Sequence, residues 1–168
     1  MQRQAKLKAY QASDLGENGL SMRAPPEGTV PSGALLDPAQ RTGLGEDAKP
    51  LALSPVKPDA KVLARGRERF DIECAVCHGL LGDGQSQVAL NMSLRRPPSL
   101  HDYRGLADGY IYGVITDGFG LMPSYAGVLS VEDRWAVVAY VRALQLSQHA
   151  PVETLPGELR GRLEKEAK

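Results

Sequence analysis

The stretch RFDIECAVCHGLLGDG, residues 69–84, contains both cysteines of a 168-residue chain and one of its three histidines. Cys74 and Cys77 stand two residues apart, and His78 follows directly. Two cysteines could form one disulfide, but this close spacing and the adjacent histidine favour a ligand site. The GLLGDG that follows is turn chemistry, so the motif ends a helix.

Cys-x-x-Cys-His is the attachment pattern of a c-type haem. Two thiols about one turn apart can bond to two vinyl groups of a porphyrin, and the next residue directs its imidazole at the iron. The sequence therefore predicts one covalent haem c, with Cys74 and Cys77 as thioether anchors and His78 as an iron ligand. A thioredoxin-like dithiol would need a strand before the motif, and no strand pattern is visible. A zinc site would need a second ligand pair, whereas only His101 and His149 remain; a disulfide across two residues would be strained.

The second axial ligand is predicted in the loop GFGLMPSYAG. Gly118 and Gly120 allow close backbone approach, and Pro123 stiffens the chain directly after Met122. A core methionine rarely lies between glycine and proline in a loop, so Met122 is the predicted iron ligand; Met92, His101 and His149 are the other candidates. Histidine with methionine raises the reduction potential and leaves no open coordination position. This pattern is typical of an electron carrier, not of a catalyst.

Further residues are expected around the haem. The second ring nitrogen of His78 needs an acceptor, and a proline carbonyl in RRPPSL suits it, with Pro98 our candidate and Pro97 the alternative. The anionic propionates would bond to one of Arg95, Arg96, Tyr103 and Arg104, of which Arg96 is our candidate. The apolar wall is predicted from Phe70, Leu100, Ile111, Ile115, Leu121, Tyr125, Trp135 and Val138; we choose Tyr125 and Trp135 as haem-contacting residues.

The chain divides into three parts by composition. Residues 1–58 hold seven of the twelve prolines and read as an extended, partner-binding arm. Residues 59–149 carry helical patterns: one from Asp59 to about Cys74, a short one over 107–116, and the clearest over 130–148, capped by Ser130. Residues 150–168 form a polar tail with leucines at 155, 159 and 163, either a docking helix or a frayed end. We expect an all-α domain. A small loop-rich domain of this kind needs a stabilising group in addition to its small apolar core.

Charge excludes several classes of partner. The chain has 20 basic and 20 acidic residues, and the balance is also local, with seven of each in 1–60 and nine of each in 61–149. Nothing resembles a nucleic-acid arm or a polybasic membrane patch. No apolar run reaches the ~18 residues of a membrane span. No leader pattern stands at the N-terminus, so the chain is cytoplasmic or a leader has been removed; covalent haem attachment favours a location outside the cytoplasm, in the periplasm.

With these motifs the sequence resembles the small monohaem cytochromes c. The resemblance covers about residues 60–148 and rests on RGRERFDIECAVCHGLLGDG, RRPPSL, GLMPSY and RWAVVAYVRALQ. In that family the first helix crosses the last through a glycine and an aromatic residue. The resemblance implies Gly66 and Phe70 on the first helix, and Tyr140 with Ala136 or Ala139 on the last.

A narrower resemblance links YRGLADGYIYGVITDGFGLMPSYAGVLSVEDRWAVVAYVRALQLSQ, and SMRAPPEGTVPSG in the arm, to the monohaem cytochrome subunit of bacterial alternative complex III. This is a membrane quinol:electron-acceptor oxidoreductase. The resemblance implies a non-catalytic carrier in a respiratory or photosynthetic complex, fed by another haem or metal centre and passing electrons to an oxidase or soluble carrier. It also implies a lipoprotein held by an acylated N-terminal cysteine. No such cysteine stands beside Met1 in this sequence. We therefore expect attachment to the membrane either by a lipid anchor or by association with partners only.

Four other functions stay open. The chain could be a free diffusible periplasmic cytochrome, or the cytochrome subunit of another dehydrogenase or oxidase complex. A haem enzyme or ligand sensor would require Met122 to leave the iron. An interaction module would depend on the arm, with the haem only as a staple.

Overall fold

The structure, a computed structural model, describes residues 4, 6–8, 11–14, 19–22, 25–29, 36–93 and 95–166. It divides into two compact units, residues 1–35 and 36–168. The described part of the first unit pairs Ala12 with Leu20 in an isolated antiparallel bridge. Much of the SMRAPPEGTVPSG stretch lies outside the described residues.

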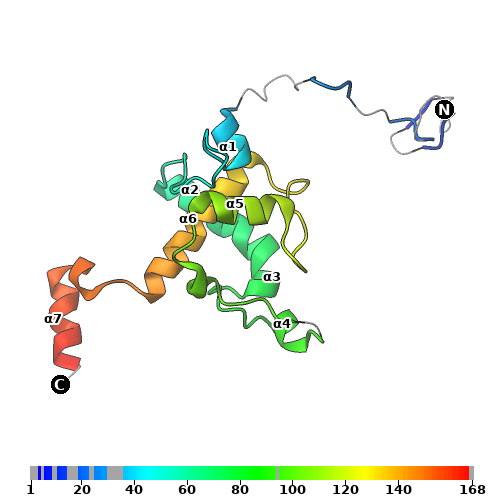
Figure 1. The fold of residues 1–168 in the computed structure, drawn as a ribbon. Helices are drawn as coiled ribbons and strands as arrows, with labels where there is room; N and C mark the ends of the chain where they lie inside the picture. The colour runs from blue at the N-terminus through cyan, green and yellow to red at the C-terminus, as the bar shows by residue number, and fades with distance from the viewer. Residues whose placement is uncertain are drawn as a thin grey trace. The chain divides into compact units, whose positions relative to one another are not determined.

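The described residues of the second unit form helices and no strand, which confirms the predicted all-α class (Figure 1). The elements in chain order are α1 (Pro38–Thr42), α2 (Ala60–Arg69), the π-helical turn η1 (Phe70–Cys74), α3 (Ala75–His78), α4 (Gln87–Asn91), the 3-10 turn η2 (Leu100–Tyr103), α5 (Asp108–Asp117), α6 (Val131–Gln148), the 3-10 turn η3 (Val152–Thr154) and α7 (Gly157–Glu166). No described helix is long and apolar enough to cross a membrane.

The helix that leads to the cysteine motif begins at a capped residue. The Asp59 carboxylate accepts from Val62 N at 2.8 Å, as a helix N-cap should. The helix runs through α2 and then widens into η1, where Ala75 N donates to Phe70 O, five residues back. Single π turns inside helices occur often at functional sites. This one ends at Cys74, so the change of helical pitch falls at the first residue of the motif.

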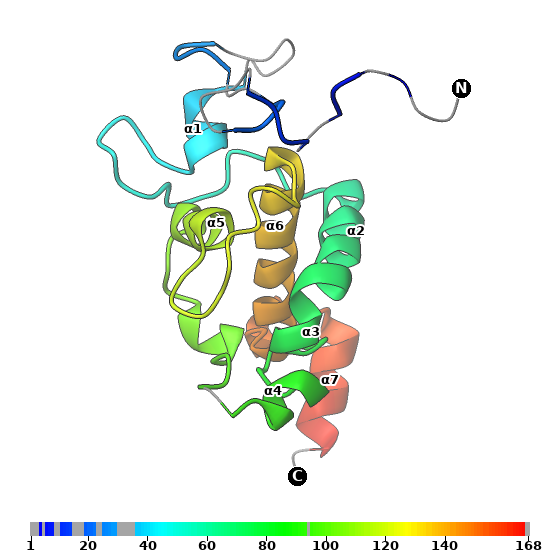
Figure 2. The same cartoon turned by 90° about the vertical axis from the view of Figure 1, so that its right-hand side faces the viewer.

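Helices α2 and α6 cross at Gly66. A Cβ on Gly66 would lie 2.0 Å from Ala136 O and 3.0 Å from Tyr140 Cβ, so the two backbones meet because this residue has no side chain. Phe70 and Tyr140 pack edge to face one turn further on, with ring centroids 5.4 Å apart. The views agree in placing the two helices side by side (Figures 1 and 2). The crossing implied by the family resemblance is therefore present.

An ion pair ties the same two helices together. Arg65 donates from Nε and Nη2 to Asp133 at 2.6 and 2.9 Å. Asp133 is the third residue of α6, and its backbone N–H is capped by Ser130 Oγ at 3.1 Å. The hydrogen bonds from Arg65, followed by its charge, hold the pKa of Asp133 below its ordinary value of 3.8.

Replacing Asp133 with Asn should reduce stability at neutral pH by about 0.5–1 kcal/mol, since Arg65 is half-exposed and water screens the pair. Because the pKa of Asp133 is lower in the folded protein, the ion pair contributes its full stabilisation above the ordinary value of 3.8. This stabilisation disappears as the pH falls through the folded pKa. Urea unfolding at several pH values should therefore show the wild type and the variant converging in acid. Glu132→Gln, in the same helical turn, is the control. A cost that persists in acid would contradict the ion-pair explanation.

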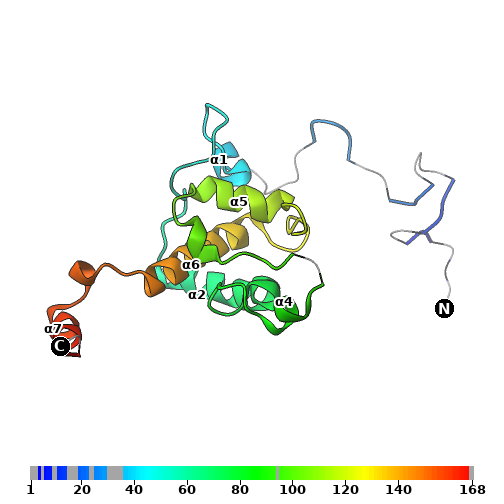
Figure 3. The same ribbon diagram turned by 60° about the horizontal axis from the view of Figure 1, so that its bottom comes forward.

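Residues 36–58 pack against α5 and α6, although the sequence analysis assigned them to the arm. Trp135 Nε1 donates to Gln40 O at 2.6 Å, and Tyr112 OH donates to Arg41 O at 2.9 Å. The two rings are fully buried and stack with centroids 4.3 Å apart. Figure 3 shows α1 beside α5. Buried indole and phenol groups need acceptors, and this segment supplies them with backbone carbonyls.

Two glycines allow the segment to approach α5. A Cβ on Gly109 would lie 2.1 Å from Gly43 O and 2.4 Å from Leu51 N. Gly109 N donates to Leu51 O, and Leu51 N donates to Gly43 O, both at 2.9 Å. The buried Asp108 carboxylate accepts from Ser54 N at 2.8 Å and from Arg142 Nε at 2.7 Å.

We expect Tyr112→Phe to destabilise the protein by about 1–2 kcal/mol, because it leaves the Arg41 carbonyl without its donor. Cleavage between residues 36 and 58 in limited proteolysis should rise in parallel. Tyr110→Phe changes an exposed phenol on the same helix and should have almost no effect. Equal behaviour of the two variants would contradict the role given to the Arg41 bond.

Candidate functional site

Helix α3 and the loop after it place the cysteine motif. Cys74 ends η1 and is buried, Cys77 is half-buried in α3, and His78 is the last residue of α3. The following loop folds back on the motif: Gly84 N donates to His78 O at 2.8 Å, and Ser86 Oγ donates to Cys77 O at 3.0 Å. The motif thus stands on a fixed backbone.

The His78 ring has an unused polar atom inside the protein. Its Nδ1 is buried and has no hydrogen-bond partner within normal distance and angle. Burial lowers the pKa of the imidazole, and the Pro98 backbone, acting as a hydrogen-bond acceptor, opposes that shift. The Pro98 backbone thus lies beside the ring, although no ordinary hydrogen bond joins them. A neutral imidazole beside a backbone carbonyl is the arrangement of a metal-binding histidine.

The two thiols do not form a disulfide with each other. Burial, with the charges of Glu73 and Cys77 adding to it, raises the pKa of the Cys74 thiol to about 12. Dithiol enzymes depend instead on a thiolate of lowered pKa. Since no strand precedes the motif in the described part of the chain either, the structure disfavours the thioredoxin-like interpretation. Among the described residues no three of His, Cys, Asp and Glu are grouped as they would be around a metal ion.

Met122 lies in a tight turn that packs against the core. Phe119 and Met122 exchange two backbone hydrogen bonds, each 3.0 Å long. Gly118 has φ +83°, and a Cβ there would lie 2.5 Å from Met122 O. The half-buried Met122 side chain contacts the apolar cluster that contains Cys74. The structure thus brings Met122 to the same core as the cysteine motif, as its predicted role requires.

Tyr125 lies close enough to both cysteines for their charges to act on its phenol. Burial raises the pKa of its phenol, and the charges of Cys74, Cys77 and Glu73 add to the shift. Its OH donates to Glu73 O at 3.3 Å. Tyr125 N donates to Ile115 O at 3.0 Å, so the residue joins the Met122 loop to α5 and to the helix of the motif.

The other predicted residues have different surroundings. Trp135 belongs to the cluster that contains Cys74, but its N–H points to Gln40 O. Arg96 is exposed and donates to Leu90 O at 3.4 Å, while Pro98 is exposed apart from its approach to His78. A role in binding haem stays a prediction for all three.

The three alternative ligands have other surroundings than Met122. His101 is buried, and its Nε2 is 2.8 Å from Leu81 O. Met92 is the C-cap of α4, and His149 is the C-cap of α6. The contact of His101 with the loop that follows the motif was not expected, since a single histidine in a loop carries no sequence signal for burial.

Comparison with known proteins agrees with this geometry. Residues 61–141 match the family model described as cytochrome c oxidase, cbb3-type, subunit III. This part of the chain is similar to cytochrome c domains. A solved structure of a reducing HAO-like protein complex from Kuenenia stuttgartiensis is similar, with a TM-score of 0.50 and 26% identity. The match covers 54% of this chain and 46% of that one, so the chain spans less than half of that relative. No curated protein matches the sequence significantly.

Cytochrome c domains carry covalent haem c and transfer electrons. The residues present fit that group: two unpaired thiols stand one turn apart, and the His78 ring follows directly, beside the Pro98 backbone. The matched region 61–141 includes the motif, the Met122 loop and the first part of α6.

Proposed function

We propose that this chain binds one haem c through thioethers at Cys74 and Cys77, with His78 and Met122 as axial ligands, and works as a one-electron carrier. The observation that carries the proposal is the Cys-x-x-Cys-His motif on one helical turn, where two free thiols stand beside a half-buried histidine ring. When bound, the haem supplies an iron couple that exchanges one electron. The Pro98 carbonyl orients the His78 ring, and the turn closed by Phe119 and Met122 holds the thioether sulfur in place.

We further propose that the carrier is the monohaem subunit of a membrane quinol-oxidising complex of the alternative complex III type. The long stretch from Tyr103 to Gln148 and the proline-rich segment in residues 21–33 support this assignment by their resemblance to that subunit. In this proposal residues 1–35 contact neighbouring subunits, and the protein lies on the periplasmic side, held by a lipid anchor or by its partners. Another haem or metal centre donates the electron, and an oxidase or soluble cytochrome accepts it.

A second candidate is a cytochrome subunit of a terminal oxidase. The match of residues 61–141 to the cbb3-type subunit III model favours it. The two candidates differ in the reaction of the complex that contains the chain: one reduces an external acceptor with quinol, and the other reduces oxygen.

The carrier function is tested on protein purified from its native host. Intact mass should exceed the polypeptide by one haem, and the pyridine haemochrome should show two thioether bonds. The reduced protein should not bind carbon monoxide at neutral pH, because Met122 closes the coordination sphere. A bare polypeptide mass would refute the proposal.

The complex is tested by gentle solubilisation of native membranes and affinity purification through a C-terminal tag. Quinol oxidation coupled to reduction of a soluble cytochrome, without oxygen uptake, would support the quinol-oxidising assignment. Oxygen uptake by the purified complex would favour the oxidase. Recovery of the chain alone, from the soluble fraction, would favour a diffusible carrier.

A further inference from the structure

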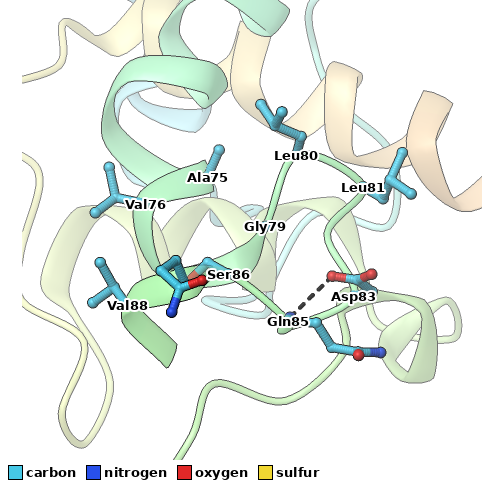
Figure 4. Close-up of a pocket in the computed structure, with 10 residues that line it drawn as sticks. Ala75, Val76, Gly79, Leu80, Leu81, Asp83, Gln85, Ser86 and Val88 are labelled. Carbon is cyan, nitrogen blue, oxygen red and sulfur yellow. Dashed lines mark hydrogen bonds between the residues drawn. The ribbon is translucent and has the colours of Figure 1, made fainter. Parts of the chain in front are cut away.

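A surface hollow of about 460 Å³ opens beside the cysteine motif. Figure 4 shows its apolar wall: Val76 projects from α3, Val88 from α4, and Leu80 and Leu81 from the loop between them. The cysteines, His78 and Met122 do not line it. It is thus a feature separate from the predicted haem ligands.

The apolar side chains of the hollow are strongly exposed. Leu80 is 65% and Leu81 58% accessible, and Val76 and Val88 are about half accessible. Burial of a leucine or valine side chain stabilises by about 1.5–3 kcal/mol, which the isolated protein forgoes here. Exposed apolar groups gathered in one place mark interaction sites more often than scattered ones do.

The stretch of chain that lines the hollow is acidic although the whole chain is neutral. Residues 70–94 contain three acidic residues and no lysine or arginine. Asp83 is the charged residue among the described lining, and Asp71 is paired with Arg67 at 3.6 Å. Glu73 and Asp83 have no ion-pair partner among the described residues. The basic Arg96 side chain donates to Leu90 O of α4, which lies beyond the wall residue Val88.

The walls of the hollow are fixed to the backbone of the motif. Asp83 accepts from Gln85 N at 3.0 Å, and a Cβ on Gly79 would lie 2.6 Å from the same carboxylate. Ser86 Oγ donates to Cys77 O at 3.0 Å and accepts from Ala89 N at 2.9 Å, so it joins α4 to α3. A protein seated in the hollow would contact elements that are hydrogen-bonded directly to Cys77.

We propose that this hollow is the docking site for a redox partner protein that presents an apolar side chain surrounded by lysine or arginine. The apolar wall would receive the side chain. Asp83 in the lining, with Glu73 three residues before the wall residue Val76, would attract the basic rim. The assignment deepens the proposed carrier function and rests on it. A second copy of the chain, and the leucine face of α7, are competing occupants that the experiment separates.

The first experiment measures binding to the reduced holoprotein by methyl NMR. Tris(phenanthroline)ruthenium(II) serves as a cationic apolar probe, and the ruthenium complex of a sulfonated phenanthroline as an anionic one. The cationic probe should shift the methyl signals of Val76, Leu80, Leu81 and Val88, and its affinity should fall with salt. Leu80→Lys should weaken the cationic probe and strengthen the anionic one. Equal binding of both probes to the wild type would overturn the proposal.

The second experiment measures the rate at which quinol-reduced native membranes reduce the added ferric holoprotein. Leu81→Ser should lower the rate about fivefold to tenfold, as loss of one apolar contact would. Leu146→Ser is the matched control, because Leu146 is also 58% accessible but lies on α6 outside the hollow. Asp83→Asn keeps the acceptor for Gln85 N and should flatten the salt dependence of the rate. Equal rates for the Leu81 and Leu146 variants would overturn the proposal.

The outcomes distinguish this docking site from the carrier function itself. If the hollow variants kept their haem, their midpoint potential and the wild-type reduction rate, the carrier function would stand and the docking site would be refuted. A protein without haem would refute the carrier function first, by its mass. Hollow signals that shift with protein concentration would assign the hollow to a second copy. If Leu159→Ser shifted the methyl signals of the hollow in dilute protein, the occupant would be α7. Either result would overturn the proposal.

Discussion

Replacing Gly66 with Ala should destabilise the holoprotein by about 3 kcal/mol or more, at the upper end of what overpacking costs. The added Cβ would lie 2.0 Å from Ala136 O and 2.6 Å from Ala136 C, and both atoms belong to the backbone of α6. A flexible side chain could turn away, but a helix backbone cannot, so the two helices must separate. Urea unfolding followed by far-UV circular dichroism would measure the loss.

The same change should disturb the site, because α2 continues through η1 into the motif. Separation of α2 from α6 moves Phe70 away from Tyr140, and Cys74 follows four residues later on the same helix. We therefore expect the Met122 sulfur to leave the iron at lower urea concentration in the variant, seen as earlier loss of the sulfur-to-iron charge-transfer band.

Gly113→Ala is the matched control for this change. Gly113 is also a helical glycine, in α5, but a Cβ there would meet nothing within 4 Å. Alanine should then add about 0.5–1 kcal/mol of stability through helix propensity alone. If both alanines stabilised the protein, the close crossing at Gly66 would be wrong.

The features predicted correctly from sequence are those with local signals. The Asp59 and Ser130 caps act within three residues and are confirmed, whereas the haem roles indicated by the Cys-x-x-Cys-His spacing stay predictions. The glycine and proline around Met122 define their turn within five residues. The family resemblance added the α2–α6 crossing, which spacing alone did not reveal.

The packing of residues 36–58 could not be predicted, because its partners lie far away in sequence. A buried Trp135 must find an acceptor for its N–H, but the acceptor, Gln40 O, is 95 residues distant. In the sequence, Gly43 looks like an ordinary loop glycine and Gly109 like an ordinary helix glycine. Only the structure shows that their backbones meet. Composition favoured an arm because prolines and glycines suit both an extended arm and a segment that follows a surface closely.

The acidic hollow was hidden for a different reason. A count over residues 61–149 gives nine charges of each sign and therefore no asymmetry. Basic residues lie in α2 and again after residue 94, but residues 70–94 contain none. Net charge over a domain is thus a poor guide to a docking face, since the face is formed by a shorter stretch than the domain.

Replacing Met122 with Ala should lower the midpoint potential by roughly 0.1–0.3 V, part of the ~0.8 V range over which axial ligands act. The thioether favours the reduced iron, and its loss leaves water or no ligand in its place. Potentiometric titration of the holoprotein would measure the shift. The ferrous variant should also bind carbon monoxide readily, which the wild type should not, because the coordination position is then open.

Met92→Ala is the control for general effects of losing a methionine. Met92 is half-buried at the end of α4, whereas Met122 contacts the cluster around Cys74, so the Met92 variant should keep both the potential and the resistance to carbon monoxide. If Met92→Ala lowered the potential and Met122→Ala did not, the ligand would be Met92 and the closed turn at Phe119 would have another role. If neither did, a histidine would be the sixth ligand, and carbon monoxide binding by the ferrous His101→Ala or His149→Ala variant would identify which one, because only loss of the ligand opens the coordination position.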